Sequence, residues 1–234
     1  MTSFKTFGIT DIGLRRQNNE DAFAILEEKR FFILADGMGG HEAGEVAALT
    51  ALESLCEAVQ NSSSMSLEKT CSFLRTAMHK ANLHVLDKAH TYPEYRGMGT
   101  TLSCFLLTEH HLIYAHIGDS RLYRYRNRLH QLTQDHSLRK RSHSPTILYR
   151  NHHIITRAIG THRVLLPDMG VIPIHSDDLF LLCSDGLSDY VPENTLSDIL
   201  GSPIPLEEKG KTLISSALEK GGRDNITLLL VHLH

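Results

Sequence analysis

The feature that most limits the fold of this chain is a series of short apolar runs, several of which end in Gly or Asp. The runs are too short for typical helices and are rich in β-branched and aromatic residues, so they favour β-strands. They cover residues 31–37, 100–108, 111–119, 179–186 and 225–233. We therefore expect a chain built around β-sheets.

Two further patterns complete the expected architecture. Residues 121–133 alternate around a turn at 126–128, which predicts a hairpin. Apolar residues recur at helical spacing over 42–60 and 67–88, and a polar connector separates these two segments. Two adjacent helices within a strand-rich chain predict an α+β fold of antiparallel sheets covered by helices, with residues 1–234 forming one domain.

Composition excludes several other classes of protein. With 41% hydrophobic and 22% charged residues among 234, the chain is typical of a globular protein with a sizeable core. No apolar run approaches the roughly 20 residues that cross a bilayer, so neither secretion nor membrane insertion is expected. The net charge of -3 disfavours general nucleic-acid binding. The four cysteines form no CxxC pair, which is typical of free thiols in a reducing, cytoplasmic compartment.

Acidic residues follow or precede these apolar runs in a repeated manner. A single Asp in a turn usually caps neighbouring backbone N–H groups. Four acids placed alike are harder to explain in that way, because carboxylates that converge need cations to offset their repulsion. Oxygen ligands select hard ions such as Mg²⁺ or Mn²⁺. The four are Asp36, Asp119, Asp185 and Asp224, and Glu20 and Asp21 add two acids before the first apolar run.

The 16 histidines give little support to a zinc site. The adjacent pairs at 110–111 and 152–153 would point to opposite sides of a strand, and no HExxH motif is present. Nucleotide-binding motifs fail as well. The glycine-rich segment 36–44 has Glu42 where GxGxxG needs Gly, and Pro205 replaces the first glycine of a Walker motif before 210–212. No GxSxG elbow occurs.

Eight ordered motifs carry a resemblance to a known family. The chain resembles the metal-dependent PPM (type-2C) protein serine/threonine phosphatases, especially their compact bacterial members, from about residue 8 to residue 231. The resemblance implies two packed antiparallel β-sheets flanked by helices on both sides, with metals at one edge of the sandwich. The motifs are DIGLRRQNNED, ILADGMGGHEAGE, GTTL, IGDSRLYRYR, LTQDHS, ITRAIG, LLCSDGLSDY and GGRDNITLLLV.

The resemblance also implies a set of metal ligands. Asp36 matches the acid that bridges two metals, and Gly37 matches the backbone carbonyl that binds one of them. Asp185 and Asp224 match the direct ligands of the other metal. Asp119 matches a ligand of a third, more weakly held metal, with Asp185 shared. The implied cofactors are two Mn²⁺ or Mg²⁺ ions, with a third at lower affinity.

Further residues match supporting positions of the family. Glu20 and Asp21 match acids that hold metal-bound waters. Arg16 matches the guanidinium that grips the substrate phosphate, for which a rigid fork is better suited than Lys. Asn225 is expected to orient Asp224, and Thr100–Thr101 are expected to serve strand packing rather than chemistry.

The implied reaction is hydrolysis of phosphoserine and phosphothreonine monoesters by direct attack of a metal-bridging water, without a phosphoenzyme. The implied partners are phosphorylated proteins and a cognate Ser/Thr kinase, with no nucleic acid and no membrane, and the chain is expected to be a monomer. One alternative is a non-catalytic phosphatase-like regulatory domain, and a nucleotide-binding or scaffolding domain is a more distant one. The first is disfavoured because each matched metal-ligand position carries the expected acid.

The sequence departs from the family pattern at two places. Met38 stands where many eukaryotic members have a His proposed as general acid, so that role falls to a metal-bound water or, less favoured, to His41. The flap between Asp135 and Thr156 is short and basic. Ten Lys or Arg residues and one acid lie between residues 121 and 163, which indicates either a face for acidic partners or solvated surface.

Overall fold

The computed structural model describes residues 3–39, 43–63, 65–138 and 154–234. Within these ranges the strands pair antiparallel into two sheets. The first sheet has the order β1 (Phe4–Asp11), β11 (Ile226–Leu233), β10 (Leu179–Cys183), β7 (Arg121–Arg126), β8 (Arg128–Gln131). The second has the order β2 (Asp21–Leu26), β3 (Phe31–Met38), β5 (Leu102–Leu107), β6 (His111–Ile117), β9 (Asp168–Pro173), and β4 (Gly99–Thr100) pairs with β3.

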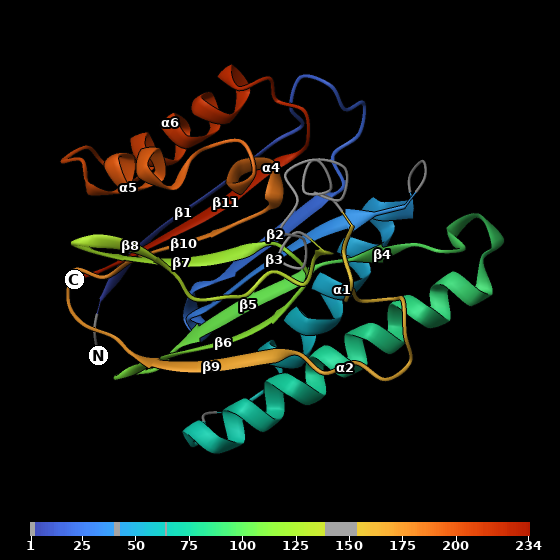
Figure 1. The fold of residues 1–234 in the computed structure, drawn as a ribbon. Coiled ribbons are helices and arrows are strands. Elements are labelled where there is room, and N and C mark those ends of the chain that lie inside the picture. Colours follow the sequence, from blue (N-terminus) through green and yellow to red (C-terminus); the bar gives the residue numbers. More distant parts are fainter. Residues whose placement is uncertain (1–2, 40–42, 64, 139–153) are drawn as a thin grey trace.

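Helices cover the outer face of each sheet, so the molecule has four layers (Figure 1). On one side, α1 (Ala43–Gln60) and α2 (Leu67–Thr91) pack on the second sheet. On the other side, α4 (Asp185–Ser188), α5 (Glu193–Gly201) and α6 (Leu206–Glu219) pack on the first sheet. Short 3₁₀ turns occur at η1 (Glu27–Lys29) and η2 (Pro93–Tyr95). Of the helices in the described ranges, none combines the length and apolarity that a bilayer crossing needs.

The two sheets are joined by an apolar layer between their inner faces. Three fully buried rings mark its centre, with centroids 4.7 Å apart for Phe32 and Phe105 and 5.9 Å apart for Phe105 and Phe180. Phe32 and Phe105 come from the second sheet and Phe180 from the first. Rings of this size remove much apolar area from water, so this layer fixes the two sheets against each other.

The expected α+β architecture is confirmed, including helices on both outer faces. The hairpin at 121–133 is present as β7 and β8, and Asn127 makes the turn with φ 62°. The helix expected over 67–88 runs three residues further, to Thr91. The run 100–108 is divided between β4 and β5, because Thr100 pairs with β3 beside the end of β5.

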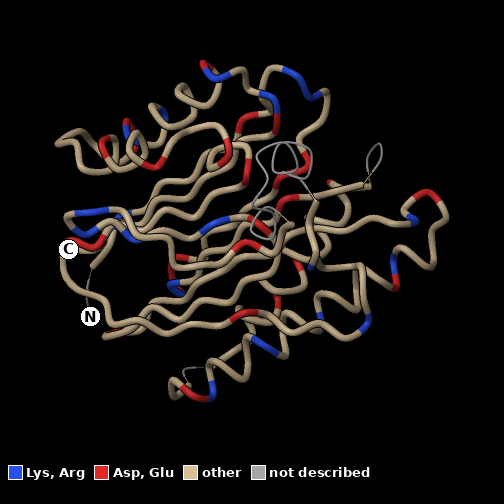
Figure 2. Tube along the Cα trace, in the orientation of Figure 1, with Lys and Arg blue, Asp and Glu red and all other residues tan. Residues whose placement is uncertain are grey.

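Several expectations about the basic segment lie outside the described residues. The Lys and Arg residues at 139–141 and 150 belong to that part of the chain, and so does His41. Within the described ranges, Figure 2 shows basic positions on the β7–β8 hairpin. Acidic positions from both sheets gather toward the opposite end of the sandwich, near the end of β3 (Figure 2).

Candidate functional site

The first two acids of the site face each other on adjacent strands. Asp21 is the first residue of β2 and pairs with Asp36 of β3 in the antiparallel register. Asp36 was expected at a strand end, but β3 continues two residues further because Gly37 and Met38 pair with β4. This pairing holds the peptide after Asp36 in extended form, so the Gly37 carbonyl has a fixed direction.

Hydroxyl groups fix the backbone of Asp36 from the neighbouring segment. The Asp36 N–H donates to Thr101 Oγ1 at 2.9 Å, and Thr100 Oγ1 donates to the Asp36 carbonyl at 2.9 Å. Thr101 Oγ1 also lies 2.8 Å from Ser120 Oγ. Both threonines are fully buried. They were expected to serve strand packing rather than chemistry, and their hydroxyl groups also hold the backbone of a site residue in place.

The first sheet supplies Asp185 and Asp224. Asp185 begins α4, two residues after β10 ends, and Asp224 stands two residues before β11. Ser184 links this sheet to the other, because its Oγ donates to Asp21 Oδ2 at 2.8 Å and accepts the Thr227 N–H at 3.0 Å. The site is therefore assembled across the inner faces of both sheets.

Glycines permit this close assembly. A Cβ at Gly186 would lie 1.9 Å from the Asn225 carbonyl oxygen, so the turn after Asp185 accepts no larger residue. A Cβ at Gly37 would lie 2.2 Å from the Gly44 carbonyl oxygen, and one at Gly44 would lie 2.7 Å from Glu20 Cδ. Gly44 thus lets α1 approach the buried Glu20 carboxylate closely.

Asn225 contacts both Asp224 and the N-terminal segment. Its backbone N–H donates to Asp224 Oδ1 at 2.8 Å, whereas its side chain points to the N-terminal segment. There, Asn225 Oδ1 accepts the Glu20 N–H at 2.9 Å, and Nδ2 donates to the carbonyls of Ile12 and Asn18 at 3.0 and 2.9 Å. Asn225 thus anchors the segment that carries Glu20.

We expect Asn225→Ala to lower the free energy of unfolding by about 2–4 kcal/mol, because it leaves a buried N–H and two carbonyls without their partner. Asn225 is only 4% exposed, so water cannot replace the lost bonds without rearrangement. Urea denaturation of the metal-free protein measures the effect. Asn194→Ala, at an exposed position of α5, is the matched control and should change stability by less than about 0.5 kcal/mol. Equal stability of the two variants would contradict the anchoring role.

Burial and mutual repulsion raise the pKa values of the clustered acids. Burial is the larger cause for each, and neighbouring carboxylates add to it. The pKa of Asp36 lies well above its usual range, with Asp21, Asp185, Asp119 and Asp224 all contributing. Burial raises the pKa of Asp21 to about 7 although hydroxyls of Thr227 and Ser184 oppose the change. It also raises the pKa of Asp119 to about 8. Ionisation of this cluster therefore calls for a nearby cation.

Asp119 provides a second sign that the site fits a cation. The residue is 6% exposed, and among the residues that the structure describes its Oδ1 has no hydrogen-bond partner. A buried carboxylate oxygen without a partner is costly unless a cation or a donor completes it. In the described ranges, no three His, Cys, Asp or Glu side chains are spaced to hold one ion by themselves. An ion here would need backbone oxygen or water ligands in addition, which suits Mg²⁺ and Mn²⁺.

Arg16 lies against the same cluster. Its Nη2 donates to Asp224 Oδ2 at 2.7 Å, while 45% of the Arg16 side chain remains exposed. The charges of Glu20 and Asp36 also act on it. Arg16 thus lies at the rim, where an exposed guanidinium could meet an anion that approaches the carboxylates.

Each acid named from the sequence takes part in this one cluster. What the sequence reasoning missed are the hydroxyl partners. The signal for some of them was present, because GTTL places two polar β-branched residues at the start of an apolar run. Ser184 and Thr227 gave no comparable signal, since their role depends on strand pairing.

Comparison with known proteins points to one family. A family model described as "Protein phosphatase 2C" matches residues 14–224. The serine/threonine phosphatase stp of Listeria welshimeri is 37% identical over 234 residues, which cover 95% of this chain and 93% of that protein.

Solved structures agree with the sequence comparison. The serine/threonine phosphatase of S. agalactiae has a TM-score of 0.92 at 31% identity and covers 99% of this chain and 100% of its own. The catalytic domain of the serine threonine protein phosphatase PstP, solved in complex with 2 manganese ions, has a TM-score of 0.88 at 33% identity. That match covers 100% of this chain and 99% of the PstP chain.

Proposed function

The chain belongs to the protein phosphatase 2C family and is a serine/threonine phosphatase, and from this premise we propose that it uses its carboxylate cluster to hold divalent cations for hydrolysis. The observation that carries this proposal is the convergence of Asp21, Asp36 and Asp119 in one cluster, where Asp21 and Asp36 face each other on paired strands and Asp119 is buried. Burial and mutual repulsion would leave these acids protonated, and a bound cation would make their ionised form favourable.

We assign the direct ligands as follows. Asp36 and the Gly37 carbonyl would hold one Mn²⁺ or Mg²⁺ ion, and Asp185 and Asp224 would hold the other beside it. Asp119 serves a third, weaker site that shares Asp185, and the unpartnered Asp119 Oδ1 supports this assignment. When bound, the ions would supply a water activated at neutral pH for direct attack on phosphorus.

The remaining residues would orient the metal ligands and the waters around the ions. Glu20 and Asp21 accept hydrogen bonds from waters around the ions. Thr100 and Thr101 hold the Asp36 peptide, so its carboxylate need not be reoriented as the reaction proceeds. Met38 cannot donate a proton, because its thioether carries none. We assign protonation of the leaving alkoxide to water in the site.

Arg16 is proposed to grip the substrate phosphate, and Arg16→Ala should therefore lower kcat/KM for a phosphothreonine peptide. We expect a loss of about 1.5–3 kcal/mol, or roughly 10- to 100-fold, because one charge-assisted hydrogen-bonding group is removed. Mn²⁺ affinity should not fall, since the change releases the Asp224 carboxylate from its ion pair. Steady-state kinetics and Mn²⁺ titration check both parts.

Arg15→Ala is the matched control for this change. Arg15 and Arg16 are adjacent, exposed and equally charged, but only Arg16 forms the ion pair with Asp224. Arg15→Ala should leave kcat/KM within about twofold of wild type. Equal losses of kcat/KM for both variants would indicate that Arg16 acts by general charge attraction and not by a specific phosphate contact.

The wider setting is also part of the proposal. We propose that residues 1–234 form one phosphatase domain that acts as a cytoplasmic monomer in signalling. Its substrates would be phosphoproteins made by a cognate Ser/Thr kinase, without nucleic acid or membrane as a partner. The four free cysteines support a reducing compartment.

One experiment tests the central proposal. Purified protein is incubated with a phosphothreonine peptide after chelation and again after Mn²⁺ or Mg²⁺ is added back. We expect release of phosphate only with the metal, and no effect of thiol alkylation, because Cys104 and Cys183 are buried and the pKa of each is raised by burial to about 12. Full activity of the chelated enzyme would overturn the proposal.

A further inference from the structure

The peptide before Asp119 is held by a histidine that the assigned site does not include. The Gly118 N–H donates to His136 Nδ1 at 3.1 Å, and the His136 N–H donates to the Gly118 carbonyl at 2.7 Å. His136 thus binds both backbone groups of Gly118, the N–H through its ring and the carbonyl through its own backbone N–H. The residue is 7% exposed.

Gly118 has little freedom to move away from this contact. Its φ of 113° lies in the region that favours glycine, and a Cβ there would lie 2.5 Å from Thr101 Cγ2. Thr101 is the residue that accepts the Asp36 N–H. Gly118 is therefore confined by Thr101 on one side and bonded to His136 on another, and the direction of the next residue, Asp119, depends on both.

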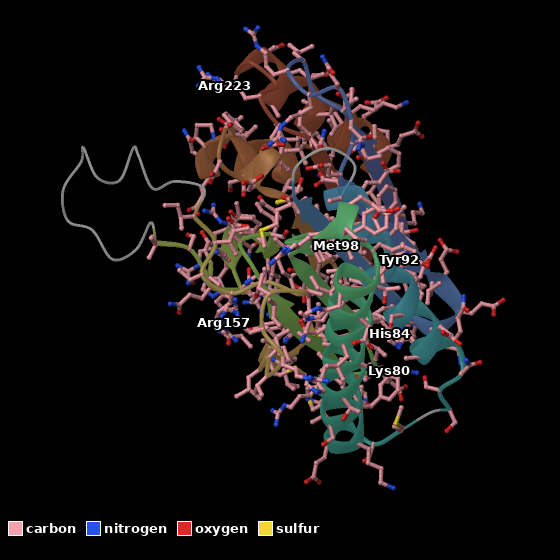
Figure 3. The ribbon with its side chains drawn as sticks, turned by 90° about the vertical axis from the view of Figure 1, so that its right-hand side faces the viewer. Lys80, His84, Tyr92, Met98, Arg157 and Arg223 are labelled. Carbon is pink, nitrogen blue, oxygen red and sulfur yellow. The ribbon has the colours of Figure 1, made fainter. Side chains whose placement is uncertain are left out.

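The His136 ring is oriented by its other nitrogen. Because Nδ1 accepts the Gly118 N–H, Nε2 carries the ring proton and donates to Asp168 Oδ2 at 3.1 Å. Arg157 Nη1 donates to Asp168 Oδ1 at 2.8 Å and also lies 2.8 Å from Nε2. Arg157 Nη1 and His136 Nε2 both carry protons, and each donates to the Asp168 carboxylate, which holds the two side chains together. Figure 3 labels Arg157 below the middle of the molecule, well separated from Arg223 near the top of the view.

The ring also packs on a second buried histidine. The centroids of His116 and His136 are 4.8 Å apart, and His116 is held by Ser103 Oγ at 2.8 Å and by the Gln134 carbonyl at 3.2 Å. Two segments of the chain therefore fix the plane and the rotation of the His136 ring. A ring held in this way suits a positioning role.

We propose that His136 is a positioning residue for Asp119, holding the Gly118 peptide through Nδ1 so that the Asp119 carboxylate is aimed at the weak cation site. The inference rests on the proposed function, which assigns Asp119 to that site. Residues that orient a metal ligand typically affect metal affinity about 10- to 100-fold. His136 touches no ligand side chain itself and acts through Gly118.

The test uses two substitutions that separate the ring nitrogens. In His136→Asn, the side-chain oxygen occupies the place of Nδ1 and can still accept the Gly118 N–H. In His136→Gln, the polar atoms lie near the place of Nε2, so that bond is lost. Mn²⁺ binding to the full chain is followed by the EPR signal of free Mn²⁺, and thermal unfolding is recorded for each variant.

Three further variants complete the design. Asp119→Asn removes the assigned ligand. Asp178→Asn changes a fully buried acid that pairs with Arg126, away from this network, and controls for lost stability. Asp168→Asn weakens the orientation of the His136 ring from a side chain that is 48% exposed, so it is a milder change if His136→Gln does not fold.

We expect Asp119→Asn to abolish the weakest Mn²⁺ site and His136→Gln to weaken it about 10-fold or more, with His136→Asn within threefold of wild type. Asp168→Asn should weaken that site less than His136→Gln, and Asp178→Asn should leave it unchanged. If Asp119→Asn removes the site but the two His136 variants behave alike, the positioning role is overturned. If Asp119→Asn leaves Mn²⁺ binding unchanged, the assignment of Asp119 fails and this inference fails with it.

Discussion

Asp36→Asn should reduce kcat about 10³-fold or more while leaving the protein folded. The substitution keeps the shape of the side chain but removes the charge of the proposed metal ligand, and bound metals typically supply several kcal/mol of transition-state stabilisation. The bonds from the Asp36 N–H and carbonyl to the Thr101 and Thr100 hydroxyls use only the backbone of Asp36, so they should survive. Turnover of a phosphothreonine peptide and Mn²⁺ titration measure the effect.

The same substitution should have a favourable effect on the stability of the metal-free protein. Burial is the largest cause of the raised pKa of Asp36, and four neighbouring acids add to it. A neutral amide at this position therefore relieves repulsion between carboxylates. The metal-free variant should therefore be at least as stable as wild type in urea denaturation. Asp87→Asn, at an exposed position of α2, is the control and should change neither quantity. An Asp36→Asn protein that unfolds, or one with wild-type turnover, would contradict the assignment.

The metal-free protein should lose stability as the pH rises from about 5 to 8. Asp21 and Asp119 have folded-state pKa values of about 7 and about 8, above the usual value near 4. Between these values the folded state binds more protons than the unfolded state, so the free energy of unfolding falls with increasing pH. We expect a loss of several kcal/mol over this range.

Saturating Mn²⁺ should remove this loss. The cation favours the ionised carboxylates, so its affinity should rise over the same pH range, and binding to the folded state stabilises it by mass action. Denaturation at several pH values, with chelator and with Mn²⁺, measures both arms. Stability of the chelated protein that is flat or rises between pH 5 and 8 would show that the cluster does not retain protons in the folded state.

Local patterns predicted the central strands and the β7–β8 hairpin, because each is a short run with a clear period and a turn signal. They did not predict α6 (Leu206–Glu219), whose Gly210 reads as a helix breaker. A Cβ at Gly210 would lie 2.4 Å from the Phe7 ring, so glycine is needed there for α6 to pack on β1. That reason is visible only when both elements are in place.

The candidate site also has a part that the sequence predicted and a part that it did not. Its acids were recognisable because charged residues beside apolar strands are unusual and the motifs occur in a fixed order. The bonds of Ser184 to Asp21 and of Asn225 to Glu20 join residues 163 and 205 positions apart, and no local pattern encodes them. For Asn225 the sequence indicated the contact with the neighbouring Asp224 but not the side-chain bonds to Ile12 and Asn18, which lie more than 200 positions away.

The pairing of β1 with β11 has a consequence for how the protein is made. Phe4 lies opposite Leu233, and Asp11 lies opposite Ile226, so the first strand of the chain pairs with the last. Contacts this far apart in sequence form slowly, because a long loop must close before they contribute. During synthesis the nascent chain cannot complete this sheet, or bring Asp224 to Asp36, until β11 has left the ribosome. Dephosphorylation should therefore begin only once β11 has emerged and paired, and a chain that stops before β11 should have no competent centre.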